Sequence, residues 1–455
     1  MTTPPPVVPP DRAQVRRVAL SSLLGTAIEY YDFLIYATLA ALVFGDLFFP
    51  DSRPELATIA SFGTLAVGYV ARPIGGIVFG HFGDRLGRKS MLVITMTMMG
   101  VASFLIGLLP TFGMVGVAAP VALVLLRLAQ GVAIGGEWGG ATLMVTEYAE
   151  PERRGFWNGV MQMGSPIGSV LSTVVVTVVT LLPDDELMSW GWRVPYLLSV
   201  LLLAAGLYVR LSIAETPVFQ KDSASAPQRL PLAQVLRRPR NLLLACAVGL
   251  GPFALTALIS TYMLSYATAI GYRRADVMTG LLLASITALI AIPLCSALSD
   301  RVGRRTVILT GAFGIMAFAW PLYTLVDTRT LAGLFAAMTI GQLAQSAMYA
   351  PLGALLSEMF GTAVRYTGAS MGYQLAALIG AGFTPMLAAT LNVGTIRSTP
   401  LIALAIGCGA ITAIAIWRIG ETRGTNLSTV SGAVAQSRDS HGGNTVDRKP
   451  VSGPS

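Results

Sequence analysis

Long apolar stretches separated by short charged gaps run along most of this chain of 455 residues. Each stretch is long enough for a helix to cross the ~30 Å hydrocarbon core of a bilayer, which takes about 20 apolar residues. The pattern predicts an all-α polytopic membrane protein with twelve transmembrane helices. Their approximate limits are residues 18–44, 56–82, 90–109, 117–146, 156–182, 192–213, 241–268, 277–298, 305–325, 331–357, 366–391 and 399–419.

The composition excludes a soluble globular fold. Apolar residues make up 54% of the chain and charged residues only 12%, whereas soluble domains carry about 25% charged residues. Lysine occurs only at Lys89, Lys221 and Lys449, and none of these directly follows a glycine, as the lysine of a Walker-type phosphate loop does. Direct ATP drive is therefore not expected, and no cofactor is implied.

The distribution of positive charge predicts the orientation in the membrane. With a cytoplasmic N-terminus, most of the 31 Lys and Arg residues fall in the predicted cytoplasmic segments, as the positive-inside rule requires. Both termini are therefore expected in the cytoplasm. The net charge of +8 is interpreted as a topology signal and not as evidence of a nucleic-acid partner. The predicted external loops hold only Arg53, Arg193, Arg273, Arg274, Arg329 and Arg397.

Polar segments divide the chain into five parts. Disordered cytoplasmic tails are expected over residues 1–17, which are Pro-rich at the start, and over residues 420–455, which are rich in Gly and Ser. A basic cytoplasmic linker over residues 214–240 is expected to join an N-terminal six-helix half, residues 18–213, to a C-terminal six-helix half, residues 241–419.

An internal repeat supports this division. The loop of residues 84–89 lies between the second and third spans, and a similar loop of residues 300–305 lies between the eighth and ninth, 216 residues later. Because six spans per half is an even number, the halves are expected to be parallel repeats related by an axis along the membrane normal. A second pair of positions repeats at an offset of 211 residues: Glu147 with Arg154, and Glu358 with Arg365.

Five further motifs, taken with the loop repeat, resemble the major facilitator superfamily and, within it, the metabolite:proton symporter family. The resemblance covers nearly the whole chain and implies proton-coupled uptake through a membrane by alternating access. Members of that family carry organic acids (shikimate, 2-oxoglutarate, citrate) or zwitterionic osmolytes (proline, betaine). We expect a monomer in the cell inner membrane. The motifs are Ile28-Glu29-Tyr30-Tyr31-Asp32-Phe33, Arg72-Pro73-Ile74-Gly75-Gly76, Arg127-Leu128-Ala129-Gln130-Gly131, Gly135-Gly136-Glu137-Trp138-Gly139-Gly140 and Gly191-Trp192-Arg193-Val194-Pro195.

Charged residues inside the predicted spans are costly in a bilayer and are candidates for proton coupling. Glu29 and Asp32 are three residues apart and share a helix face. Two neighbouring carboxylates in a desolvated site repel each other, so that one of them can carry a proton. Arg72 lies at a similar predicted depth and can neutralise one of the two acids. The proton-coupling candidates are therefore Glu29, Asp32, Arg72 and Glu137, unless these charges only lock helices together.

Arg127 and neutral polar residues are the candidate substrate ligands. A guanidinium group suits bidentate binding of a carboxylate, although Arg127 could equally lock helices. The predicted C-terminal half carries no charge within its spans before Glu358, and is expected to offer neutral contacts. The candidates are Tyr36, Arg127, Gln130, Thr256, Ser260, Tyr262, Gln342, Gln345, Tyr349, Tyr373 and Gln374.

The repeated charged positions are the candidate cytoplasmic gate. By resemblance to the superfamily, acidic and basic residues at these positions form ion pairs that close the cytoplasmic side and break when it opens. A topology signal alone would explain the basic residues but not the acids at fixed spacing. The gate candidates are Asp84, Arg85, Arg88, Glu147 and Arg154 in the first half, and Asp300, Arg301, Arg304, Glu358 and Arg365 in the second.

The favoured function is proton symport of a small organic acid, such as shikimate or a di- or tricarboxylate. A symporter of zwitterionic osmolytes is the alternative within the same family. A membrane enzyme is not favoured, because no cluster of acids, His or Cys is found at a predicted aqueous face. No metal site is expected, since Asp184-Asp185-Glu186 are interpreted as a solvated loop.

Overall fold

The computed structural model describes residues 12–50, 54–212, 231–237, 239–361, 364–392 and 397–425, and every regular element in these ranges is a helix. Most of the predicted tails and linker lie outside the described residues. Three helices extend into them, because α1 begins at Arg12, α12 covers Pro231–Arg237 and α13 begins at Pro239. The predicted all-α fold class is confirmed.

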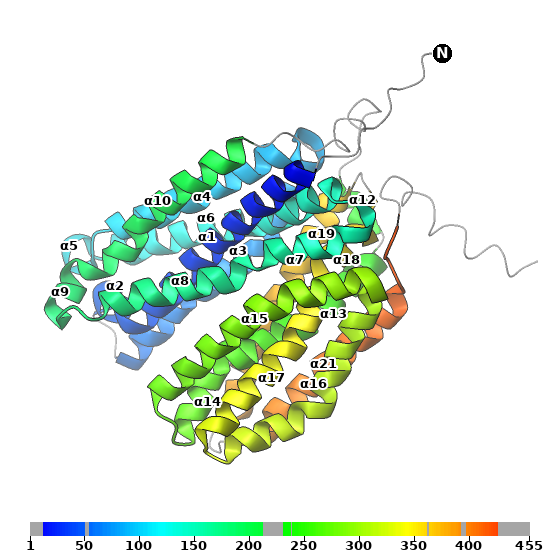
Figure 1. Cartoon of the computed structure of the whole chain (residues 1–455). Helices are drawn as coiled ribbons and strands as arrows, with labels where there is room; N and C mark the ends of the chain where they lie inside the picture. Colours follow the sequence, from blue (N-terminus) through cyan, green and yellow to red (C-terminus); the bar gives the residue numbers. More distant parts are fainter. Residues whose placement is uncertain are drawn as a thin grey trace, which may run out of the picture.

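The N-terminal helices form one bundle, drawn from blue to green in Figure 1 and here called the N-terminal bundle. Short helices connect its longer members at both ends. Its elements are α1 (Arg12–Leu42), α2 (Phe44–Phe48), α3 (Pro54–Leu86), α4 (Arg88–Leu108), α5 (Phe112–Val115), α6 (Ala118–Tyr148), η1 (Pro151–Arg153), α7 (Arg154–Gln162), α8 (Gly164–Val179), α9 (Asp184–Ser189), η2 (Gly191–Arg193) and α10 (Val194–Leu211).

The helices that follow α12 form a second bundle beside the first, here called the C-terminal bundle (Figure 1). Two of its long helices are interrupted by π-helical turns, η3 and η5. Its elements are α13 (Pro239–Thr256), η3 (Ala257–Tyr262), α14 (Met263–Ala269), α15 (Arg274–Val302), α16 (Arg304–Asp327), α17 (Leu331–Tyr349), α18 (Leu352–Met359), α19 (Arg365–Ala377), η5 (Leu378–Phe383), α20 (Thr384–Leu391) and α21 (Thr399–Ile419).

Ten helices or helical runs among the described residues are long and apolar enough to cross a membrane. They coincide with ten of the predicted spans. The remaining two predicted spans, residues 56–82 and 366–391, fall on α3 and on the run from α19 through η5 to α20, which are also helical.

A proline precedes the irregular part of the helix in the predicted seventh span. Pro252 lies inside α13, five residues before η3 begins at Ala257, and its ring nitrogen cannot donate to the carbonyl of Val248. The freed carbonyl oxygen of Val248 instead accepts a hydrogen bond from the Thr412 hydroxyl at 3.2 Å. A side chain of α21 thus replaces the missing backbone bond, and the helix continues into the π turn.

The two repeated loops have the same backbone conformation. Gly87 has φ 104° and ψ 152°, and Gly303 has φ 99° and ψ 151°. Only glycine adopts this positive φ readily, so that each loop can turn sharply into α4 or α16. The end of the molecule that carries these loops is here called the motif end. Arg12 at the start of α1 lies 4.0 Å from Glu150 there, and α21 also ends there.

The two bundles share an apolar core only toward the motif end. One buried cluster combines side chains of both bundles, among them Trp138, Met161, Phe253 and Tyr373. Toward the opposite end each bundle has a separate apolar core. The core of the N-terminal bundle includes Trp192, and the core of the C-terminal bundle contains residues of that bundle alone. The bundles are therefore held together near one end.

Candidate functional site

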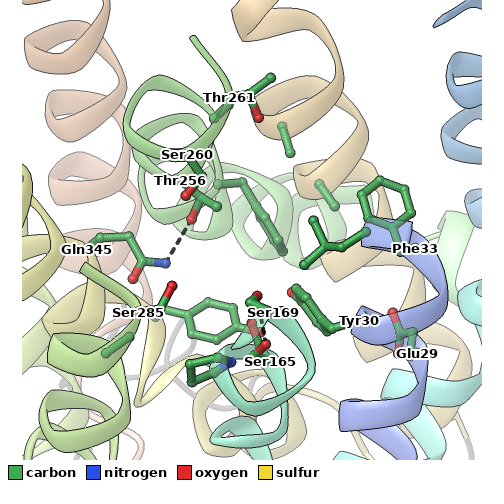
Figure 2. A pocket seen from close by; sticks show the side chains of 18 of the residues that line it. Glu29, Tyr30, Phe33, Ser165, Ser169, Thr256, Ser260, Thr261, Ser285 and Gln345 are labelled. Atoms are coloured by element: carbon green, nitrogen blue, oxygen red, sulfur yellow. Dashed lines mark hydrogen bonds between the residues drawn. The ribbon is translucent and has the colours of Figure 1, made fainter. Parts of the chain in front are cut away.

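A cavity of about 170 Å³ lies between the two bundles. Figure 2 shows that Glu29, Tyr30 and Phe33 reach it from α1, and that Ser165 and Ser169 reach it from α8. Its opposite wall comes from the C-terminal bundle. The polar lining residues of that wall are Thr256, Ser260, Thr261, Ser285, Gln342, Gln345 and Tyr349.

The N-terminal wall carries one acid and one cation. Glu29 is 6% exposed, and its carboxylate makes no hydrogen bond or ion pair with any residue that the structure describes. The Arg72 guanidinium lies 4.8 Å from the centre of the Phe33 ring and 4.4 Å from that of Tyr69. Stacking on two rings holds this planar cation in place. Both Glu29 and Arg72 line the cavity, as expected for groups that act on a substrate or a proton.

The C-terminal wall is a chain of neutral hydrogen bonds. The Gln342 amide donates to Oε1 of Gln345 at 2.8 Å, and the Gln345 amide donates to the Thr256 hydroxyl at 2.9 Å (Figure 2). These residues come from α17 and α13. Their remaining donors and acceptors can hydrogen-bond hydroxyl or carboxyl groups of a ligand. Gln342, Gln345, Tyr349, Thr256 and Ser260 thus lie where the sequence predicts neutral contacts.

Asp32 does not line the cavity, because its side chain faces α4. Ser103 donates to Oδ2 of Asp32 at 2.6 Å and accepts from the Gln130 amide at 2.7 Å. Gln130 in turn accepts from Arg127 at 2.9 Å. Oδ1 of Asp32 is buried without a hydrogen-bond partner among the described residues. Asp32, Ser103, Gln130 and Arg127 form one buried polar chain across α1, α4 and α6, here called the Asp32 chain.

Arg127 is buried behind the cavity wall. Its guanidinium lies 3.6 Å from the centre of the Tyr36 ring, and the Tyr36 hydroxyl is hydrogen-bonded to Thr64. Nε and Nη2 of Arg127 have no hydrogen-bond partner in the described part of the chain. In this conformation Arg127 contacts both Tyr36 and Gln130, and none of these three predicted ligands lines the cavity.

Glu137 is held in an ion pair that sequence reasoning did not find. Nη1 of Arg210 on α10 lies 2.8 Å from Oε1 of Glu137, and both side chains are buried. Arg210 stands near the cytoplasmic end of its predicted span, residues 192–213, and is not among the predicted partners of Glu137. The sequence signal that could have predicted this ion pair is Glu137 itself, since an acid in the middle of a membrane span requires a partner.

Tyr373 and Gln374 lie behind the cavity, at the contact between the bundles. The Tyr373 hydroxyl is 3.0 Å from that of Tyr349, and the Gln374 amide donates to the backbone carbonyls of Ile134 and Gly135 on α6. The remaining neutral candidate, Tyr262, donates to the carbonyl of Ala388 on α20. None of Tyr262, Tyr373 and Gln374 lines the cavity.

An ion-pair cluster at the motif end joins the bundles. Oε1 of Glu147 lies 3.2 Å from Arg88 of its own bundle and 3.3 Å from Arg365 of the other. All three side chains are buried. The sequence predicts these residues as gate members, but not that Glu147 pairs across the bundles. The side chains of two further candidates, Asp84 and Arg85, lie outside the described part.

The repeated cluster in the C-terminal bundle joins the bundles in a second way. Arg304 pairs with Asp300 and lies 3.5 Å from Glu358. Asp300 also accepts the backbone N–H groups of Gly155 and Phe156. These N–H groups belong to the first turn of α7, which lacks internal acceptors for them. Asp300 therefore caps a helix of the N-terminal bundle.

The segment after α21 completes this closure. Glu421 accepts the backbone N–H groups of Arg304 and Arg305 at the start of α16, and the Thr422 hydroxyl donates to Glu358 at 2.6 Å. The carbonyl of Thr425 accepts from Arg154 of the N-terminal bundle at 2.9 Å. Sequence reasoning assigns these residues to a disordered tail and misses them.

Arg301 lies near the same segment through its backbone, since its carbonyl accepts from Arg423. With the ion pairs across the bundles, these contacts close the motif end of the cavity.

Among the described residues, no group of three or more His, Cys, Asp and Glu could hold a metal ion.

Comparison with known proteins decides the family. The model of the Major Facilitator Superfamily matches residues 22–369. The chain belongs to the major facilitator superfamily. The Inner membrane metabolite transport protein YhjE of Escherichia coli (strain K12) is 39% identical over 420 residues, which cover 90% of this chain and 95% of that protein.

Two further relatives show which members of the superfamily this chain is similar to. The Shikimate transporter of Escherichia coli (strain K12) is 39% identical over 387 residues, 83% of this chain and 88% of that protein. The Proline/betaine transporter of Salmonella typhimurium is 32% identical over 395 residues, 84% of this chain and 78% of that protein. These matches confirm the resemblance to the metabolite:proton symporter family that the motifs predict.

The fold agrees with a solved member of the superfamily. The structure of the proton:xylose symporter XylE bound to 6-bromo-6-deoxy-D-glucose superposes with a TM-score of 0.74 at 16% identity, covering 92% of this chain and 98% of that chain. The relatives are transporters, so this member of the superfamily is a multi-pass membrane transporter and not an enzyme. Its cavity, placed between two bundles and closed at the motif end, is the candidate substrate site.

Proposed function

We propose that the chain is a proton-coupled symporter that takes up a small organic acid by alternating access. In this proposal twelve helices form two parallel six-helix halves in the inner membrane. The halves cover residues 18–213 and 241–419, and both termini are cytoplasmic, so that the motif end faces the cytoplasm. The observation that carries the proposal is a central cavity holding one unpaired acid and one cation, sealed at the motif end by ion pairs between the bundles.

The paired clusters support alternating access. Arg88 with Glu147 and Arg304 with Glu358 occupy equivalent positions of the repeat, after two loops of the same conformation. Contacts between the bundles at this end must break before the cavity can open there. A rocking motion of one repeat against the other provides such a change without moving the binding site.

Two acids in α1 support proton coupling. Glu29 faces the cavity without a partner, and Asp32 keeps one buried oxygen unpartnered among the described residues. Burial without a partner disfavours the charged carboxylate, so that either site can hold a proton. In the proposal a carboxylate takes a proton from the external side and loses it to the cytoplasm after the cavity opens at the motif end.

The cavity supports a substrate with one carboxylate and several hydroxyl groups. Arg72 is the one guanidinium among the described lining residues, and the opposite wall offers hydroxyls and amides. Shikimate has one carboxylate and three hydroxyl groups and matches this arrangement. A di- or tricarboxylate would place further negative charge against neutral groups and near Glu29. Arg127 would contact substrate only in a conformation other than the present one.

The ring side chains of the cavity support the second candidate, a zwitterionic osmolyte such as betaine. Tyr30, Phe33, Tyr69, Phe253 and Tyr349 line the same space as Glu29. Aromatic faces together with an acid are suited to a quaternary ammonium group. The carboxylate of such a substrate would then pair with Arg72, so that both candidates use the same cation.

Transport into proteoliposomes tests the proposal. The purified full chain is reconstituted, and radiolabelled shikimate is supplied with an inward-directed proton gradient. We expect accumulation above the external concentration, and loss of that accumulation when a protonophore is added. Unlabelled 2-oxoglutarate, citrate, proline and betaine are then added as competitors. If shikimate is not taken up, each competitor is supplied in labelled form instead. Gradient-driven uptake of betaine without uptake of shikimate would support the osmolyte symporter, and absence of gradient-driven uptake of every candidate would contradict symport.

Substituting lysine for each arginine separates their roles. Arg72→Lys keeps the charge but loses the planar group stacked between two rings, and we expect the KM for shikimate to rise about tenfold, equivalent to about 1.4 kcal/mol. Arg127→Lys serves as the comparison, because Arg127 does not line the cavity. A raised KM in Arg127→Lys with an unchanged KM in Arg72→Lys would assign the carboxylate to Arg127.

A further inference from the structure

The glycine-rich stretch of α6 brings its backbone into contact with side chains of the other bundle. A Cβ atom added at Gly139 would overlap Ser370 of α19, and one added at Gly140 would overlap the Tyr366 ring. Tyr366 also donates a hydrogen bond to the carbonyl of Gly136 at 2.7 Å. Because glycine has no side chain, α19 of one bundle can lie directly on α6 of the other. We call this contact the α6–α19 seam.

One large side chain interrupts the glycine-rich stretch at the seam. Trp138 is buried and stacks flat on Tyr373 of α19, with ring centres 3.5 Å apart and an angle of 13° between the planes. Phe253 of α13 packs edge-on against the same Tyr373 ring at 4.8 Å. These rings belong to the apolar core shared by both bundles. A stack of this kind fills the space between the bundles and excludes water from it.

The stack is connected to the cavity through a hydrogen bond. Tyr349 and Phe253 line the cavity, and the Tyr349 hydroxyl lies 3.0 Å from the Tyr373 hydroxyl. Tyr373 thus contacts a cavity residue on one side and Trp138 on the other. The ion pairs around Glu147 and Glu358 lie farther toward the motif end, so the aromatic stack is a separate layer between them and the cavity.

We propose that Trp138 and Tyr373 form an aromatic plug that seals the cavity from the motif end, and that Tyr373 links the plug to the substrate through Tyr349. This inference rests on the proposed alternating access, because the plug must separate when the motif end opens. Trp138 is a residue of the bundle that holds Glu29 and Arg72, whereas Tyr373 belongs to the other bundle. Separation of the bundles therefore separates the stack directly. Both residues are positioning residues, since neither lines the cavity.

The accessibility of a buried position in the interface tests the plug without requiring transport. Ser357 is buried and accepts a hydrogen bond from Thr146 of the other bundle. In the full chain with its three cysteines replaced by alanine, Ser357→Cys is labelled by a membrane-impermeant maleimide applied from the motif end. Trp138→Ala and Tyr373→Ala are compared with the parent. Trp192→Ala is the matched control, because Trp192 is equally buried but lies in the core of the N-terminal bundle alone.

We expect the two plug variants to raise the labelling rate about tenfold, which corresponds to a shift of about 1.4 kcal/mol toward the open motif end. The control should label at the parent rate. Parent rates in both plug variants would overturn the proposal. If an alanine variant does not accumulate in the membrane, Trp138→Phe replaces it. This variant has a smaller ring face and should label at an intermediate rate, and a parent rate would again overturn the proposal.

Tyr373→Phe tests the link to the cavity. This variant keeps the ring stack but loses the hydroxyl that bonds to Tyr349, so its labelling rate without substrate should equal that of the parent. In the parent we expect shikimate to change the labelling rate, and in Tyr373→Phe we expect no change. An equal response to shikimate in both would overturn the link. If the parent shows neither shikimate uptake nor a shikimate response, the proposed function fails, while faster labelling of the alanine variants still supports the plug.

Discussion

At the scale of single residues, buried charges differ in whether they have partners. Glu137 forms an ion pair with Arg210, whereas Glu29 and Asp32 form no ion pair with any residue that the structure describes, and Asp32 accepts a hydrogen bond from the neutral Ser103 hydroxyl. A paired charge contributes to packing and is costly to disturb, while an unpaired carboxyl group can change its protonation state. We therefore propose that Glu29 and Asp32 couple transport to protons and that Glu137 has a structural role.

Removing one partner of the buried pair should destabilise the protein more than removing both. Glu137→Gln leaves Arg210 buried without a counter-ion, and we expect a loss of about 3–5 kcal/mol. Glu137→Gln combined with Arg210→Met removes both charges and should recover most of that stability. Thermal unfolding of the purified protein in detergent measures both effects. Concentrative uptake by the double variant is expected, and its complete loss in a stable double variant would return Glu137 to the proton-coupling group.

Asp32→Asn removes a titratable group while keeping the size and the hydrogen bond from Ser103. We expect this variant to exchange shikimate across the membrane but not to accumulate it against a gradient. The comparison uses counterflow and gradient-driven uptake in the same proteoliposomes. Asp184→Asn, a change in the exposed helix α9, is the control. Full gradient-driven accumulation by Asp32→Asn would leave Glu29 as the coupling acid.

At the scale of helices, close packing between α3 and α6 depends on glycine. A Cβ atom added at Gly75 would lie within 3.0 Å of three backbone atoms of Val132, and backbone cannot move aside as a flexible side chain can. The contact fixes α3 against α6 and so fixes Arg72 in the cavity wall. The neighbouring Asp32 chain crosses from α1 to α6 at the same region of the bundle.

Gly75→Ala should therefore destabilise the N-terminal bundle by about 1–3 kcal/mol, the usual range for overpacking. The matched control is Gly63→Ala in the same helix, where an added Cβ atom meets nothing within 4 Å. Alanine there should be neutral or slightly stabilising, because it favours the helix over glycine. Unfolding temperatures of the two variants give the comparison, and equal values would show that α3 can move away from α6.

At the scale of the whole molecule, Glu147 forms ion pairs with arginines of both bundles, Arg88 and Arg365. Its substitution by Gln should weaken the contacts to Arg88 and Arg365 together and increase the population with an open motif end. Spin labels at Leu86 and Val302, which are exposed at this end of opposite bundles, report the separation in double electron–electron resonance spectra. We expect a longer distance to gain population.

Glu150→Gln is the control for this measurement. Glu150 lies at the same end, but its ion pair with Arg12 is long and exposed, and such pairs contribute about 0–1 kcal/mol. The distance distribution of Glu150→Gln should match that of the parent. Identical distributions in Glu147→Gln and in the parent would show that other contacts between the bundles suffice to keep the motif end closed.

Much of the helical arrangement could be predicted from sequence because bilayer thickness and charge patterning act locally along the chain. The same holds for Arg88 with Glu147 and Arg304 with Glu358, whose pairing follows from the repeat. The contact of Glu147 with Arg365, the burial of Arg127 behind Tyr36 and the partner of Glu137 depend on how separate helices face one another. Hydrophobic pattern gives the face of a helix but not the neighbour that it meets.

The folded part of this chain extends beyond its last helix, because the segment after α21 contacts both bundles. Glu421 and Thr422 satisfy backbone and carboxylate groups of the C-terminal bundle, and Thr425 accepts from the N-terminal bundle. A chain cut directly after Ile419 would leave the first turn of α16 and the buried carboxylate of Glu358 without these partners. Truncated fragments should therefore end after Thr425, and fusion tags should be attached after it, so that the contacts of residues 420–425 are kept.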